Sequence, residues 1–481
     1  MRLPLVRVGI IAATLAADCC FSPVPVGGAD LPASTDAGVK LLAEGDKLAD
    51  RKEPTEAVLK YKLAFEQLLP GLRQIPFRSE VKRDVTRRED LKAVLLKELD
   101  EDMTPAEFRT GELGFKALGL IDRDLDWKAT MVRVYSEEIA AFYDPKTKTM
   151  HLIRESDQAP KEVGFLEALM GKKGGFDKDE NKTVIAHELT HALADQHYDL
   201  DAMQEKVKKD DDQSMALSGL IEGEATLAMF GAQLEDWDGT KITAVPAARL
   251  NTLFSMLGPL LPMAGGAGLR EAPPILAESL TFPYFRGLVF CAQLTNKGGW
   301  RAIDAAYAHP PQSTEQILHP EKYLDKPDPP TILDLGTLDA GPGWAEVGRN
   351  VLGEFQLGIL LRRHGGRPIA AGWDGDRYVV FEGPDKRLGL AWLTTWDTDD
   401  DARDFARQYT RFQTTKLGPG AESPAAFPDS IRRPKDGTFC AVERQGRDVA
   451  VVEGFDSPTT ERLVAALLKA TRAELPALKA D

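Results

Sequence analysis

The stretch His187-Glu188-Leu189-Thr190-His191 lies within a run whose apolar spacing predicts a helix over residues 179–196. Its two histidines are four residues apart, so a helix places both imidazoles on one face, one turn apart, where they can bind the same metal ion. Glu188 follows the first histidine and can reach a water molecule on that metal. The pattern therefore predicts a metal centre with a neighbouring base. The plainer alternative is a helix that merely displays two histidines.

A zinc site needs a third protein ligand and an open position for water. The candidates are Glu222 and Glu224, on a second predicted helix over residues 214–234. Because they are two residues apart, they point to opposite sides of a helix, and only one can face the metal. We favour Glu222, since the Thr226 hydroxyl four residues on could reach a ligand, whereas Ala228 is in the same relation to Glu224. A solvated surface charge is the alternative for either glutamate.

These motifs resemble a known group of enzymes. Residues 187–192, with Asp195 after them, resemble the zinc helix of thermolysin-like enzymes, and residues 222–225 (Glu-Gly-Glu-Ala) resemble the third-ligand segment of aminopeptidase-type gluzincins. The resemblance covers about residues 140–230. It implies a zinc metallopeptidase, a hydrolase in which His187, His191 and Glu222 hold Zn²⁺ and Glu188 is the general base. The interval between the two motifs is longer than in many members.

The resemblance also implies a donor for the oxyanion, since gluzincins often use a tyrosine or histidine downstream of the zinc helix. The candidates are His319, Tyr284 and Tyr307. His319 is our first choice, although a loop histidine beside a proline has a plainer explanation. It lies in the stretch 313–323, which is similar to uncharacterised bacterial exported proteins.

Residues 140–153 contain two β-prone runs around Asp144-Pro145, which predicts a β-hairpin. In zincins, a sheet edge beside the zinc helix pairs with extended substrate backbone, and such pairing binds peptides with little side-chain selectivity. One strand of the hairpin could be that edge. A purely structural hairpin explains the pattern equally well.

Helical patterns dominate the first two thirds of the 481-residue chain, and beyond residue 336 the pattern becomes strand, strand, helix, twice over. We therefore expect an α+β protein: a mostly helical, zincin-like catalytic domain with a small sheet, followed by a ββα-ββα domain. The expected divisions are a signal peptide (1–29), an N-terminal helical region (30–130), the catalytic domain (131–330) and the C-terminal domain (336–481).

The first 29 residues show the features of a secretory signal: Arg2 and Arg7, a short apolar run, and small residues before Asp30. We expect an exported protein, periplasmic or secreted, and lipidation at Cys19 or Cys20 would attach it to the envelope. No apolar stretch predicts a transmembrane span. The net charge of −15 argues against nucleic acid as a partner. The expected partner is a protein or peptide substrate.

Two classes of function compete with a peptidase. One is a catalytically inactive zincin-like protein that acts as a binding or scaffold protein of the cell envelope; the intact Glu188 argues against it. The other is a zinc hydrolase that acts on a non-peptide amide, which the sequence does not distinguish from a peptidase.

Overall fold

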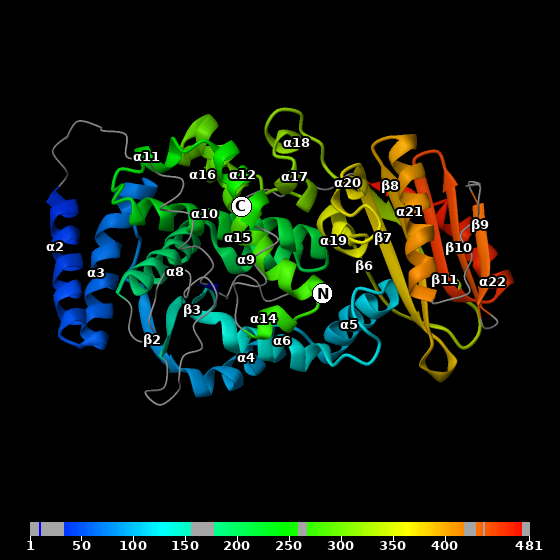
Figure 1. Ribbon diagram of the computed structural model, residues 1–481, viewed down its shortest axis with the longest axis horizontal. Coiled ribbons are helices and arrows are strands. Elements are labelled where there is room, and N and C mark those ends of the chain that lie inside the picture. The colour runs from blue at the N-terminus through cyan, green and yellow to red at the C-terminus, as the bar shows by residue number, and fades with distance from the viewer. Residues whose placement is uncertain are drawn as a thin grey trace.

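The computed structural model describes residues 9–10, 33–154, 178–257, 267–417, 430–435 and 438–473. These residues form the expected α+β protein, with a mainly helical body at one end and a sheet-containing domain at the other (Figure 1). The predicted signal peptide, including Cys19 and Cys20, lies outside the described residues except for Gly9–Ile10.

The N-terminal part of the body is helical. A helical hairpin, α2 (Ala33–Asp50) and α3 (Pro54–Arg73), is followed by α4 (Arg88–Asp102), α5 (Pro105–Leu118) and α6 (Trp127–Glu138). Local sequence explains where three of these helices begin. Pro54 fits the first turn of α3. Thr104 and Glu107 form a capping box at the start of α5, and the Asp126 side chain caps the start of α6.

A four-stranded sheet lies in the body, in the order β1 (Gly9–Ile10), β3 (Ile139–Asp144), β4 (Thr149–Arg154), β2 (Lys82–Arg87). β3 and β4 form an antiparallel hairpin, which confirms the predicted hairpin. β2 runs parallel to β4, and β1 runs antiparallel to β3 at the opposite side of the sheet.

Three long helices form the centre of the body: α8 (Lys178–Tyr198), α10 (Asp211–Gln233) and α15 (Pro274–Gly298). α10 packs against both of the others. Gly219 and Gly223 on α10 face Gly287 on α15, and a Cβ on Gly223 or Gly287 would collide with the backbone of the other helix. The two helices therefore touch backbone to backbone. The shorter elements around them are α9 (Leu200–Val207), α11 (Thr240–Thr243), α12 (Ala247–Leu257), α14 (Ala267–Glu271), α16 (Trp300–Ala308), α17 (Thr314–Leu318) and α18 (Glu321–Leu324).

One hydrophobic core runs through the body, with members from Ala57 on α3 to Ile317 on α17. Residues 30–130 and 131–330 thus share a core. Among the described residues, only α15 is long and apolar enough to cross a membrane, and most of that helix is buried inside the protein.

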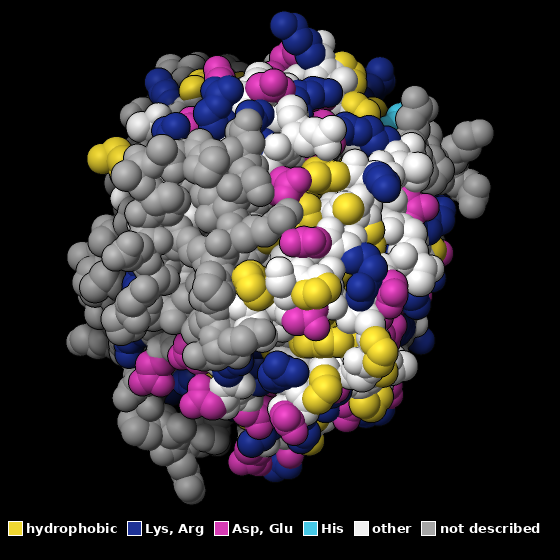
Figure 2. All heavy atoms as spheres, turned by 90° about the vertical axis from the view of Figure 1, so that its right-hand side faces the viewer, with side chains coloured by type: hydrophobic (Ala, Val, Ile, Leu, Met, Phe, Trp, Pro, Cys, Tyr) yellow, Lys and Arg dark blue, Asp and Glu magenta, His cyan; other side chains and the backbone are white. Residues whose placement is uncertain are grey.

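The C-terminal domain contains a six-stranded antiparallel sheet in the order β6 (Ala345–Asn350), β7 (Trp373–Glu382), β8 (Leu388–Trp396), β11 (Asp448–Phe455), β10 (Thr438–Gln445), β9 (Ser430–Lys435). α21 (Asp399–Leu417) packs on one face and α22 (Ser457–Leu467) on the other. β7-β8-α21 and β10-β11-α22 are the two expected ββα units, and β6 and β9 add the two outer strands. The short pair β5 (Ile332–Asp334) and β12 (Thr471–Ala473) lies beside them. Figure 2 shows basic, acidic and apolar side chains interspersed on the outer face of this domain.

The C-terminal domain is joined to the body through α19 (Gly353–Leu360), which is followed by α20 (Arg367–Ala370). Phe355 packs on Phe282 of α15, with ring centroids 4.1 Å apart. Asp212, in the first turn of α10, accepts hydrogen bonds from the Thr314 hydroxyl (2.5 Å) and the Thr314 N–H (3.1 Å). The Phe355 N–H in turn donates to Thr314 Oγ1 at 3.1 Å. The start of α10 is thus tied to both α17 and the C-terminal domain.

Candidate metal centre

α8 and α10 bring two histidines and one glutamate to a single buried point. His187 Nε2 lies 3.0 Å from Glu222 Oε2 and 3.0 Å from His191 Nε2. His191 Nε2 lies 3.3 Å from Glu222 Oε2. Ligands of a tetrahedral zinc ion, each at about 2.0–2.1 Å from the metal, lie about 3.3 Å from one another. The spacing of the three donor atoms therefore suits a zinc ion.

The chemistry of this donor set also fits a cation. Two imidazole nitrogens at 3.0 Å repel each other unless a proton or a cation lies between them. Glu222 Oε1 is buried and has no hydrogen-bond partner among the described residues. Burial raises the pKa of Glu222, but His191 and His187 outweigh that effect, so its pKa lies below the usual range. Glu222 is therefore an anion facing two histidines.

Glu224 points away from this centre. Its carboxylate accepts hydrogen bonds from Arg73 Nε and the Tyr307 hydroxyl, and Arg73 also binds Asp304 at 2.7 Å. The two glutamates thus face opposite sides of α10, as their spacing predicts. The expected contact between the Thr226 hydroxyl and a metal ligand is not seen, because Thr226 Oγ1 has no hydrogen-bond partner within the part of the chain described.

Glu188 lies beside the three donor atoms but outside their group. Its side chain is 1% exposed, and burial raises its pKa to about 7; His187 opposes this rise and Glu222 adds to it. The main-chain N–H of Tyr143 on β3 lies near its carboxylate and acts to lower this pKa. Glu188 Oε1 has no partner among the described residues. A carboxylate with a pKa near 7 can accept and return a proton at neutral pH.

Of the three candidate oxyanion donors, only Tyr284 lies at the centre. Its ring stacks on His187 with centroids 5.8 Å apart and an interplanar angle of 23°. Tyr307 is bound to Glu224 on the other side of α10. His319 pairs with Glu354 of α19 at 2.9 Å, at the junction with the C-terminal domain, so the structure does not bring our first choice to the site.

Asp195 connects α8 to the β3–β4 hairpin. It accepts hydrogen bonds from the Tyr143 hydroxyl (2.7 Å), Lys148 Nζ (2.8 Å) and the Leu200 N–H (3.1 Å). Tyr143 therefore binds α8 through its hydroxyl at Asp195, and its N–H lies near Glu188. Sequence reasoning missed Tyr143 and Lys148. The only signal in the sequence was a tyrosine within an apolar strand, and a lysine in the turn after it, shortly before the helix that carries His187.

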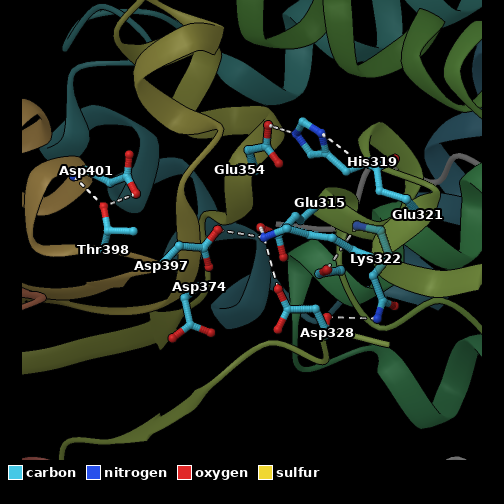
Figure 3. A network of polar contacts seen from close by, with 12 residues as sticks. Glu315, His319, Glu321, Lys322, Asp328, Glu354, Asp374, Asp397, Thr398 and Asp401 are labelled. Carbon is cyan, nitrogen blue, oxygen red and sulfur yellow. Dashed lines mark hydrogen bonds and ion pairs between the residues drawn. The ribbon is translucent and has the colours of Figure 1, made fainter. Parts of the chain in front are cut away.

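A second acidic cluster, Glu315, Asp328 and Asp397, is also close enough to hold a cation. The Lys322 ammonium already lies among these carboxylates, 2.6 Å from Glu315, 3.0 Å from Asp328 and 2.8 Å from Asp397 (Figure 3). Burial raises the pKa of Glu315 to about 9, with Lys322 opposing. This cluster joins the body to the C-terminal domain through its own lysine, so it is an interdomain ion-pair network.

Comparison with known proteins identifies only part of the chain. Residues 342–465 match the family described as Domain of unknown function (DUF8575). The match spans the six-stranded sheet with α21 and most of α22, and it excludes the metal centre. No curated protein and no solved structure matches the chain.

Proposed function

We propose that the protein is a zinc-dependent metallopeptidase of the gluzincin type that hydrolyses peptide bonds in protein or peptide substrates. His187, His191 and Glu222 would hold the Zn²⁺. The observation that carries the proposal is the convergence of these three donor atoms beside a buried carboxylate, Glu188, that is not among them. A purely structural zinc site has no use for a buried base beside its ligands.

The residues around the centre have distinct roles in this reaction. When bound, Zn²⁺ supplies a Lewis acid that makes water a stronger acid and polarises the substrate carbonyl. Glu188 takes the proton from the attacking water and delivers it to the leaving amine nitrogen. The Tyr143 hydroxyl binds Asp195 and so fixes β3 against α8, with the Tyr143 N–H near the Glu188 carboxylate. Tyr284, whose ring stacks on His187, is the candidate donor to the oxygen that becomes negative.

The amino-terminal sequence supports an exported location, periplasmic or extracellular, with the mature chain beginning near Asp30. Sequencing the N-terminus of the exported product tests this proposal. Recovery of the chain only in the cytoplasm with Met1 intact contradicts it. A lipid on Cys19 or Cys20 changes the attachment and keeps the export.

The test of the enzymatic proposal combines metal analysis with cleavage of a peptide library. The mature chain, beginning near Asp30, is expected to bind about one zinc and cleave members of the library. Glu188→Gln is the matched variant, because it keeps the shape of the side chain and removes its base. A chain that binds zinc but cleaves nothing, or a Glu188→Gln chain as active as wild type, contradicts the proposal and favours a binding protein.

A further inference from the structure

One edge of β3 faces the proposed base. β3 packs against α8, and the Tyr143 N–H lies near the Glu188 carboxylate. Main-chain groups along a strand alternate between its two sides, so Ala141, two residues earlier, directs its N–H and C=O toward the same side. This outer edge of β3 therefore runs directly to the candidate catalytic centre.

The chain places its own residues on that edge. In β1, Gly9 lies opposite Ala141 and Ile10 opposite Ile139, in antiparallel orientation. β1 is the outermost strand of the sheet and also lies against α8. Without β1, β3 would be an open edge with unpaired main-chain groups beside α8.

We propose that Gly9–Ile10 occupy the position in which an extended peptide substrate pairs with β3, so that a chain retaining these residues is latent. The inference rests on the proposed peptidase function. A substrate peptide paired antiparallel to β3 would place one residue in the position of Gly9. The peptide residue two positions earlier then lies opposite Tyr143 and hence near Glu188. The occupant of the edge and a substrate bound for cleavage thus compete for the same main-chain groups.

The attachment of β1 explains how so short a strand can compete. A tethered segment has an effective concentration of about a millimolar, so weak pairing is enough to fill the edge. Val8, Ile10 and Ile11 are apolar and β-branched, and such residues are enriched in strands. Removal of the predicted signal peptide would remove this occupant, and cleavage during export would then activate the enzyme.

The experiment uses the full chain and disrupts the strand without truncation. Gly9→Pro/Ile10→Pro removes both N–H groups, and Ile10→Val is the matched control that keeps them and a β-branched side chain. Amide hydrogen exchange at Ala141 reports the pairing independently of activity. We expect exchange at least about tenfold faster in the proline variant than in wild type, with Ile10→Val unchanged. Equal exchange in all three chains overturns the inference, whatever their activity.

Cleavage of a library peptide then tests whether this edge is the substrate edge. We expect the proline variant, with unchanged zinc content, to cleave at least about tenfold faster than wild type, and a synthetic peptide of residues 1–17 to inhibit it. The same peptide carrying both prolines should not inhibit. Altered exchange with equal, measurable cleavage refutes the substrate assignment. Altered exchange with cleavage in no chain refutes the peptidase function itself, while the pairing of β1 with β3 stands.

Discussion

Replacing each of the two glutamates of α10 by glutamine should separate metal binding from structural support. Glu222→Gln removes a negative charge that faces two histidines, and zinc affinity should fall by more than the roughly 10–100-fold typical of outer-shell changes. Glu224→Gln should leave zinc content unchanged, because its carboxylate faces Arg73 and Tyr307 instead.

Glu224→Gln should instead lower stability. Both Arg73 and Glu224 have side chains 1% exposed, and breaking a buried ion pair by changing one partner costs about 3–5 kcal/mol. Asp304 remains as a second anion 2.7 Å from Arg73, and glutamine keeps an acceptor, so we expect the lower figure, about 3 kcal/mol. At about 2 °C per kcal/mol for a large domain, the Tm falls by about 6 °C.

The assay is elemental analysis after equilibration with a zinc buffer, followed by thermal unfolding of each metal-free chain. Glu222→Gln serves as the control for thermal unfolding, and Glu224→Gln as the control for metal content. Loss of zinc in Glu224→Gln with retention in Glu222→Gln would show that the orientation of α10 described above is wrong.

Three further outcomes can be checked. Glu188→Gln should keep zinc and fold while cleavage slows by at least about 10²–10⁴-fold in steady-state assays; a loss within tenfold would exclude it as the base. Gly287→Ala should destabilise the protein by about 1–3 kcal/mol in denaturant unfolding, because its Cβ meets the α10 backbone, whereas Gly298→Ala at the end of the same helix should change little; equal effects would refute the close packing. The hydrogen bond with Glu354 raises the pKa of His319. The pair therefore stabilises the fold fully below the unfolded histidine pKa of about 6.5, until Glu354 itself protonates, and this contribution is lost as pH rises through the folded value. The Tm difference between wild type and His319→Gln should accordingly shrink from pH 6 to pH 9, and a constant difference would contradict this.

The parts of the centre that were predictable from sequence follow helical geometry. A spacing of four residues puts His187 and His191 together, and a spacing of two separates Glu222 from Glu224. The partner of Glu224 was not predictable, since Arg73 lies 151 residues before it and no local pattern connects the two residues. The pairing of His319 with Glu354 of the C-terminal domain was likewise not predictable, because the two residues are 35 positions apart and no local pattern connects them.

The outer strands of the large sheet were missed for a physical reason. β6 (Ala-Glu-Val-Gly-Arg-Asn) is exposed to half-buried throughout, and β9 is basic and contains Pro434. Edge strands bury little and are often charged or interrupted by proline, so they lack the apolar runs by which β7, β8, β10 and β11 could be recognised. β2 (Lys-Arg-Asp-Val-Thr-Arg) is similarly charged.

The glycine contact between α10 and α15 has a consequence for how this centre can change during evolution. Side chains that separate two helices can be exchanged for larger or smaller ones, and the helices then shift by fractions of an ångström. Where backbone meets backbone at Gly223 and Gly287, no such adjustment exists. Tyr284 lies one helical turn before Gly287, so it belongs to the part of α15 whose main chain is held against α10. In the proposed peptidase, new substrate preferences would therefore have to arise on walls of the site other than this part of α15.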